Sequence, residues 1–503
     1  MKRNEIESAL NEISDQYIQK AAFPKKHSNP FYLGAIAAVL ALVLVAGILL
    51  RPYSSRPGLP TLSTEPQDPF QLATQPPQET LSHGPITMAN GFHGSYALAQ
   101  AQYPAQHPYP IDDTDGSAYG LWRDDWKALR NHPAGYADSL EHYFSAAVPM
   151  LLNETPGENA ICSPLNIYMA LAMLAELTDG TSRSQILQLL QAEDIESLRT
   201  QAGQVWKSHD YNDGLSTSIL GASLWLDSAY TCNQDTAQLL ADQYFASVFT
   251  GDLGTEEMDK ALQSWLSSQT GGLLDDYIED ICMDPLTTLA LASTIYYQVQ
   301  WTAGFSERLS AEGTFHSPQG DRTVTFMQQA LPYGPYYWGE HFSAVGLGLE
   351  DNSTMWLFLP DEGTTPEELL SGGEVFQFLY SEKKQSKDLI VELQLPKFDI
   401  SGRQDLVNQL KALGVTDIFI PGVADFSPII QEDDDGYVSE VTHAARMSID
   451  EKGVTAAAFT LILRCGASMP PDERIEFILD RPFVFVVESQ DGLPLFAGTV
   501  YEP

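Results

Sequence analysis

Apolar residues follow two different periods along this chain. Between residues 165 and 180 they recur at helical spacing, in LNIYMALAMLAELTDG, and we predict that this helix stops at Gly180. The run SRSQILQLLQA opens a second helix directly afterwards. Later apolar segments are β-branched and aromatic, which is typical of strands; the predicted strands are 286–301, which we expect to be buried, and 354–360, 481–489 and 495–503. Helices followed mostly by strands predict an α+β domain.

The longest apolar run lies near the N-terminus, from Phe31 to Leu50. It holds 20 residues without a charge or a proline. At about 1.5 Å of rise per residue, a helix of this length crosses a hydrocarbon core of roughly 30 Å. Five basic residues precede the run, and Arg51 and Arg56 follow it. The positive-inside rule therefore predicts a transmembrane helix with the N-terminus in the cytoplasm and the rest of the chain outside.

Two other interpretations of residues 31–50 are less consistent with the sequence. A cleaved signal peptide needs a short apolar region and a small-x-small exit, whereas this run ends in Gly-Ile-Leu-Leu-Arg. A buried core helix needs a comparable partner segment, and none precedes the run. We therefore expect a signal-anchor helix and a single-pass protein of the cell membrane with an extracellular domain.

The composition changes after the apolar run. From about residue 57 to 115 the chain is rich in Pro, Gln and Thr and keeps no helical or strand period, which indicates an extended spacer. A Pro-rich docking ligand is the alternative, but no clean PxxP run dominates. The predicted organisation is a cytoplasmic segment 1–30, a transmembrane helix 31–50, a spacer 51–117 and a globular domain 118–503.

Charge and motif content restrict the function. The chain has 27 Lys+Arg against 67 Asp+Glu, a net charge of −40, which argues against a nucleic-acid partner because phosphates would be repelled. Four cysteines in 503 residues exclude a disulfide-built scaffold, and without a CxxC we expect no zinc site and no other metal. The chain has no GxSxG, HExxH, GxxxxGK[ST] or GxGxxG motif, so we assign no catalytic residue and no cofactor.

Several runs of the globular domain resemble the serpin family of serine protease inhibitors, in collinear order. The run ICSPLNIYMALAMLAELTDGTSRSQI is similar to the one that opens the family's central helix, and STIYYQVQWTAGF to its Tyr-Phe-x-Gly-x-Trp strand. The run VSEVTHAARMSIDEKGVTAAAFT resembles the serpin hinge. Further matching runs are FLPDEG, VELQLPKFDI, ADFSPI, RPFVFVV and LPLFAGTV. On these runs the chain is identified as a bacterial-type member of the family, and the apolar run 31–50 adds the expectation that it is membrane-anchored.

The resemblance implies a fold and a mechanism. The serpin fold packs helices on a large mixed β-sheet, with smaller sheets and an exposed reactive-centre loop, here 451–471. A serine protease cleaves this loop and is trapped as a covalent acyl complex while the loop inserts as a new central strand. The resemblance thus implies a monomeric suicide-substrate inhibitor of extracellular serine proteases and not an enzyme.

The resemblance also implies structural residues beneath the sheet, where its strands part: Ser163, Ser293, Trp301 and His443. Taken alone, His443 is interpreted as a satisfied core histidine, so both lines of reasoning make it structural, and the resemblance adds a part in conformational change. Three positions depart from the family pattern, because Ser293-Thr294 replaces Asn-Ala, Val299 replaces Gly, and Asp450 replaces Asn before Glu451. Because of the first departure, Ser293 offers a single hydroxyl, in place of the family's asparagine amide, to bond with His443.

The predicted hinge lies in a stretch without proline, between Pro428 and Pro470, which leaves its backbone able to join a sheet. The alternate positions Val454, Ala456 and Ala458 would share one face of an extended strand. Alone, residues 454–463 favour an ordinary helix because they are rich in alanine; the resemblance favours a mobile hinge. Its residues are Glu451, Gly453, Val454, Thr455, Ala456, Ala457 and Ala458.

The family's spacing from Gly453 implies that the cleaved bond joins Ala467 to Ser468. Alanine before the bond suits a protease with a small specificity pocket, as elastase-like enzymes have. Arg464 is a competing bait for trypsin-like enzymes. Cys465 beside it is a free thiol, a mixed-disulfide site or merely a small residue.

Two other functions stay open at this point. A non-inhibitory serpin would act as a binding or structural protein, although the small hinge residues suit insertion. An exported hydrolase is the other, and the absence of a nucleophile motif argues against it.

Overall fold

The computed structural model describes residues 97–110, 116–272, 274–279, 281–381, 384–432, 436–439, 441–454 and 473–503. The predicted transmembrane run 31–50, most of the predicted spacer, and residues 455–472, which include most of the predicted loop 451–471, lie outside these ranges. Within the ranges no helix combines the length and the apolar character that a membrane span requires.

The helices gather mostly in the first half of the domain, as the sequence pattern predicts. They are α3 (Ser117–Leu129), α4 (Leu140–Leu152), α5 (Pro164–Leu177), α6 (Gly180–Leu189), α7 (Ile195–His209), α8 (Gln234–Gln243), α9 (Glu256–Thr270), α10 (Asp275–Ile278), α11 (Pro366–Ser371), α12 (Glu374–Leu379), α13 (Val407–Ala412) and the 3-10 helix η1 (Asp417–Phe419).

Helix α5 is the central helix, and nearly all of its residues are buried. It begins at Pro164, whose fixed φ suits the first helical position, and the Ser163 hydroxyl accepts the Asn166 N–H at 3.3 Å. The predicted stop at Gly180 was wrong. The helix ends at Leu177 because Thr178 is extended, and Gly180 instead begins α6, with φ of 58°.

The strands form two sheets. The order in the large sheet is β1 (Ala97–Ala99), β5 (Ala246–Gly251), β4 (Thr217–Asp227), β6 (Leu289–Gln300), β14 (Gly453–Val454), β13 (Thr442–Ile449) and β12 (Phe398–Asp405), with β3 (Tyr211–Asn212) on β4. The order in the second sheet is β15 (Arg474–Ile478), β11 (Ser386–Pro396), β8 (Gly320–Trp338), β9 (Phe342–Gly348), β10 (Thr354–Pro360), β16 (Phe483–Glu488), β17 (Pro494–Val500) and β2 (Ala160–Cys162), with β7 (Ala311–Ser317) on β8.

The large sheet is nearly divided between β6 and β13. Strand β6 pairs with β4 along ten residues, from Leu289 to Gln298, but on its other side only Val299 and Gln300 are paired, with β14. Strand β13 meets β14 through Ile449 and Val454 alone. No ladder joins β6 directly to β13 in the part of the chain that the structure describes, so the sheet has an opening between these two strands, hereafter the slot.

The slot explains why one prediction needs correction. The predicted strand 286–301 is confirmed as β6, but the strand is only partly buried: its first five residues, 289–293, are all half-exposed. Strands β10, β16 and β17 fall where the sequence predicts them.

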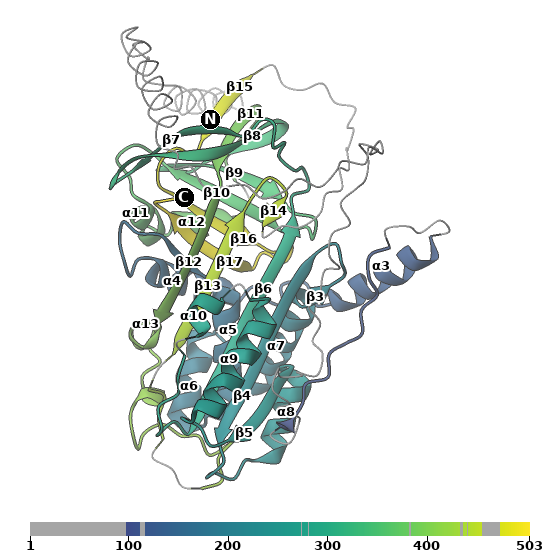
Figure 1. Cartoon of the computed structure of the whole chain (residues 1–503), viewed down its shortest axis with the longest axis vertical. Helices are drawn as coiled ribbons and strands as arrows, with labels where there is room; N and C mark the ends of the chain where they lie inside the picture. Colours follow the sequence, from purple (N-terminus) through teal and green to yellow (C-terminus); the bar gives the residue numbers. More distant parts are fainter. Residues whose placement is uncertain are drawn as a thin grey trace, which may run out of the picture. The chain divides into compact units, whose positions relative to one another are not determined.

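Helices α5 and α9 cover opposite faces of the large sheet. Helix α9 contributes Met258, Leu262 and Trp265 to an apolar cluster with Trp225 of β4, and Ala292 of β6 packs against that cluster. Helix α5 lies between β6 and β17 of the second sheet. In Figure 1, α5 to α9 gather around the lower part of the large sheet, and most of the second sheet lies above them.

The fold begins before the predicted domain boundary at residue 118. Strand β1 pairs with the edge strand β5, and the Tyr103 ring stacks on Trp206 and Phe245, with ring centroids 5.9 and 6.5 Å apart. The backbone N–H of Tyr109 donates to the backbone carbonyl oxygen of Asp213 at 2.6 Å. These residues fall in the predicted spacer, yet they pack on the globular domain.

Candidate functional site

The turn that leads into β14 is held by the Asp450 side chain. Its Oδ1 accepts the N–H groups of Lys452 and Gly453 at 2.8 and 3.2 Å, and its own N–H donates to the Gly453 carbonyl at 3.1 Å. In both of its side-chain hydrogen bonds Asp450 is the acceptor, a role that the amide oxygen of an asparagine could also fill. The replacement of the expected Asn by Asp450 therefore leaves this turn intact.

Gly453 is required at its position because the backbones approach closely. A Cβ atom there would lie 2.3 Å from the Val299 carbonyl oxygen and 2.7 Å from Gln300 Cα. Neither backbone atom can move without breaking the ladder to β6. Trp301 fixes the same corner, since its backbone N–H donates to Lys452 O and its Nε1 to Asp450 O, both at 2.9 Å.

Glu451 anchors the turn to the body of the domain. Its carboxylate is buried, lies 2.7 Å from the Lys397 ammonium and accepts the Ser310 hydroxyl, also at 2.7 Å. Burial raises the pKa of the Glu451 carboxyl, but the hydrogen bonds from Lys397 and Ser310 outweigh it and lower the pKa below its ordinary value. The carboxylate is therefore charged and paired at neutral pH.

Val454 is the last described residue before the gap at 455–472, and its side chain is buried. It stands opposite Val299 of β6 and Ile449 of β13, and directly opposed residues of antiparallel strands share a face. Val299, which replaces the family's Gly, therefore packs beside Val454 on the inner face of the sheet.

A second group of polar residues lies farther along the slot, beneath the sheet. The N–H of Ser163 donates to Nε2 of His443 at 3.0 Å, and the Ser163 hydroxyl donates to Leu495 O at 2.7 Å. The Asn166 amide donates to Ser293 O at 3.1 Å, and the Ser293 hydroxyl donates back to Asn166 Oδ1. Ser293 thus bonds with Asn166, whereas the sequence suggested His443.

His443 is an acceptor in this group because it is neutral. Burial lowers the pKa of its imidazole to about 4. Nε2 is then unprotonated near neutral pH and can accept the Ser163 N–H.

The predicted site residues therefore fall into two groups at different points of the slot. Glu451, Gly453, Val454 and Trp301 form the hinge corner, and Ser163, Ser293 and His443 lie beneath the sheet. Asn166, which links Ser293 to the start of α5, was missed as a site residue, although it belongs to the motif that suggested the family. Residues Thr455, Ala456, Ala457, Ala458, Ala467 and Ser468 lie outside the described residues.

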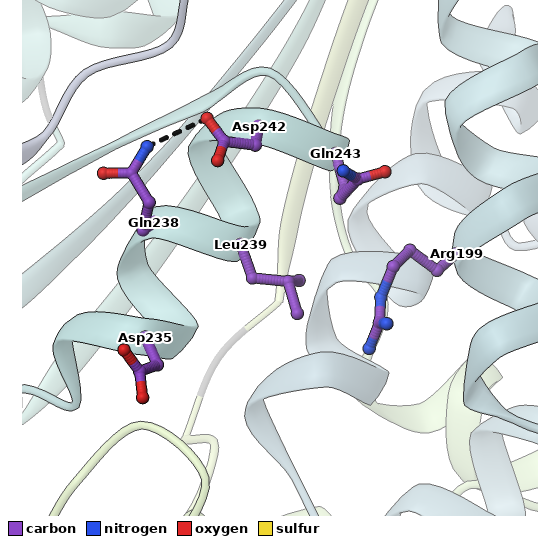
Figure 2. A pocket seen from close by; sticks show the side chains of 6 residues that line it. All are labelled: Arg199, Asp235, Gln238, Leu239, Asp242 and Gln243. Carbon is purple, nitrogen blue, oxygen red and sulfur yellow. Dashed lines mark hydrogen bonds between the residues drawn. The ribbon is translucent and has the colours of Figure 1, made fainter.

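A shallow depression lined by none of these residues lies between α7 and α8 (Figure 2). Gln238 donates to Asp242 there at 2.8 Å, and Arg199 forms two hydrogen bonds with the buried Glu176. These polar groups are engaged with one another and form no nucleophile–base pair. Nor do the described ranges hold a group of three or more His, Cys, Asp or Glu side chains able to bind a metal ion.

The two sheets, the slot and the hinge corner define a class of α+β protein whose central sheet has room for a further strand. Comparison with known proteins identifies the family. The family model described as "Serpin (serine protease inhibitor)" matches residues 144–503. Since this is more than half of the chain, the chain belongs to the serpin family. Serpins are protease inhibitors and not catalytic enzymes.

Individual relatives agree with this assignment. The plasma serine protease inhibitor of Mus musculus is 30% identical over 374 residues, covering 70% of this chain and 87% of that protein. The putative serpin-Z6C of Oryza sativa subsp. japonica is 28% identical over 384 residues, covering 69% and 91%. In solved structures, the thermophilic serpin Tengpin in its native state has a TM-score of 0.65 at 24% identity, covering 81% of this chain and 99% of Tengpin, a likeness of fold.

The buried His443 predicts a pH-dependent stability. Its pKa of about 4 in the folded state lies below the ordinary 6.5, so the unfolded chain binds more protons between these pH values. Stability is then lost as pH falls from about 6.5 towards 4, at roughly 1.4 kcal/mol per pH unit from this group. The free energy of unfolding, measured by urea unfolding at several pH values, should change less with pH between 4 and 6.5 in His443→Gln than in the wild type. An equal pH dependence of the unfolding free energy in both proteins would contradict the assignment of His443 as a buried, neutral imidazole.

Proposed function

We propose that this chain is a suicide-substrate inhibitor of extracellular serine proteases, acting by cleavage of the reactive-centre loop and insertion of the loop into the slot between β6 and β13. The single observation that carries the proposal is the register at the mouth of the slot. There β14 already lies between β6 and β13, and the loop continues directly from β14.

Extending this register gives each further hinge residue two neighbours. Counted on from the observed pairs of Val454, the facing pairs in the inserted state would be Tyr297 and Met447 for Ala456, Ile295 and Ala445 for Ala458, and Ser293 and His443 for Thr460. On β13 these inner positions are all buried and alternate with exposed or half-exposed ones. Small side chains at 456 and 458 can enter such a face without displacing the core.

The covalent step and the insertion are coupled through the two ends of the loop. Val454 leads out of the large sheet, whereas Arg474 begins β15 in the second sheet. The protease serine attacks the carbonyl carbon of Ala467, the amine of Ser468 leaves with a proton, and the acyl ester stays on the part of the loop attached to Val454. That part is then free of β15 and can move into the slot with the protease attached.

The hydrogen bonds gained are sufficient in magnitude. Roughly ten inserted residues, each contributing about 0.5–1.5 kcal/mol net, would release on the order of 10 kcal/mol. The whole stability of a folded protease is about 5–15 kcal/mol. The released free energy is therefore enough to distort an attached enzyme.

We further propose an elastase-like target and a bacterial-type, single-pass location in the cell membrane. Alanine at 467 supports the first, because a small apolar side chain fills a shallow specificity pocket and leaves a deep acidic pocket unsatisfied. The uncharged run 31–50 with basic residues before it supports the single-pass membrane location.

Incubation with a panel of serine proteases tests the proposal directly. We expect a covalent complex, resistant to boiling in a denaturing gel, with elastase-like enzymes and a slow or absent reaction with trypsin-like enzymes. Ala467→Arg should shift the preference towards trypsin-like enzymes. Mass spectrometry should find a C-terminal fragment that begins at Ser468. A fragment beginning at Cys465 would assign the bait to Arg464, and cleavage without any complex would indicate a non-inhibitory serpin.

The hinge assignment predicts that Ala456→Arg abolishes inhibition and leaves a cleavable substrate. The reason is a charge placed unpaired on the inner face of the sheet, which costs several kcal/mol. Thr455→Arg is the matched control, because an inserted strand in the same register would place residue 455 on the outer face, opposite the half-exposed Gln298 and Ser448. The measurement is the stoichiometry of inhibition, which should stay near the wild-type value in Thr455→Arg and be lost in Ala456→Arg. Inhibition by Ala456→Arg at the wild-type stoichiometry would show that the inner positions are wrongly assigned.

The anchor proposal predicts that the full-length protein fractionates with membranes and that external protease releases the globular domain. The measurement is immunodetection of the domain in membrane and soluble fractions, with N-terminal sequencing. A mature N-terminus at or beyond Arg51 would show that the apolar run is cleaved.

A further inference from the structure

Three residues stand in one row across neighbouring strands of the large sheet, next to the slot. Tyr211 of β3 lies opposite Ser218 of β4, and Ser218 lies opposite Tyr297 of β6. Directly opposed residues share a face, and all three side chains are buried. The small serine between two tyrosines leaves space for both rings to lean towards a common point.

That common point is the carboxylate of Asp351, in the turn between β9 and β10 of the second sheet. Its Oδ2 accepts the Tyr211 hydroxyl at 2.5 Å and the Tyr297 hydroxyl at 2.8 Å. The Ser353 hydroxyl also donates to Oδ2, and the Ser353 N–H donates to Oδ1, both at 2.9 Å. Asp351 is only 6% exposed, so these hydrogen bonds are shielded from water.

The phenols are fixed as donors. Burial, and then the negative charge of Asp351, raise the pKa of Tyr211 and of Tyr297 well above the ordinary value for tyrosine. The Tyr297 ring also lies 6.0 Å from the ring of Phe496 on β17. The side chain of Tyr297 thus reaches from the large sheet to the second sheet.

We propose that Asp351 is a positioning residue for loop insertion: through Tyr297 and Tyr211 it holds β6 and its neighbours on the second sheet and so keeps β6 apart from β13. This inference deepens the proposed function and rests on it. Tyr297 is two residues from Val299, where pairing with β14 begins, so the tether acts at the mouth of the slot, where Ala456 would enter.

The tether matters because no ladder joins β6 directly to β13 among the residues that the structure describes. The N–H and C=O groups of β6 that point away from β4 would pair directly with β13 if the two strands approached each other. A closed ladder would have to be broken before a new strand could enter. Releasing Tyr297 should therefore slow insertion.

The test uses the intact full-length chain and a synthetic peptide with the sequence of residues 455–462, TAAAFTLI, as the inserting strand. Uptake is followed by native gel mobility and by the rise in unfolding temperature. Tyr297→Phe deletes one hydroxyl and should slow uptake about tenfold. Tyr296→Phe is the matched control, because that hydroxyl donates to Gln298 on the outer face; its uptake rate should stay within about twofold of the wild type.

The outcomes separate the inference from the proposed function. If the wild type takes up no peptide, the insertion mechanism fails and the inference fails with it. If the wild type takes up the peptide and Tyr297→Phe does so equally fast or faster, the inference alone is overturned. Combining Tyr297→Phe with Asp351→Asn should slow uptake no more than the slower single variant, whereas additive effects would show that Tyr297 does not act through Asp351.

Discussion

The large sheet is held together across its middle by a strand of only two residues, Gly453 and Val454. Below this strand, in the part of the chain that the structure describes, no ladder joins the facing edges of β6 and β13. Unpaired backbone groups in a sheet are costly and attract another strand. The arrangement around the slot follows from this constraint: Gly453 permits the close approach, Asp450 and Trp301 fix the turn, and Glu451 secures it to Lys397.

The same constraint connects the hinge with the residues beneath the sheet. His443 and Ser293 lie on the two strands that flank the slot, and each is tied to the start of α5, through Ser163 and Asn166 respectively. These hydrogen bonds hold β6 and β13 on the start of α5, and they leave the facing edges of the two strands available to a further strand. Asp351 does the same for β6 and β3 from the side of the second sheet. These hydrogen bonds tie both flanking strands to the core, whereas no ladder of the described residues joins the two strands along the line that a new strand would occupy.

Much of this arrangement can be predicted from the sequence, and the remainder depends on contacts between distant residues. Alternation and aromatic content predict β10, β16 and β17, and the order of motifs predicts the family. The end of α5 was misplaced because Thr178 becomes extended before the glycine is reached. The partner of Ser293, the role of Asn166 and the meeting of Tyr211 with Tyr297 at Asp351 join residues 54 to 140 positions apart, and no local pattern announces them. The start of the fold at β1 was missed because its residues resemble the Pro- and Gln-rich stretch before them.

The central claim is that the slot between β6 and β13 receives a strand after the loop is cleaved. Hydrogen–deuterium exchange of β6 and β13, measured on the intact chain and again after a protease has cut the loop, tests this most directly. The account predicts that backbone amides on the slot side of both strands exchange measurably in the intact chain and become strongly protected after cleavage. Unchanged exchange on both strands after complete cleavage would contradict it.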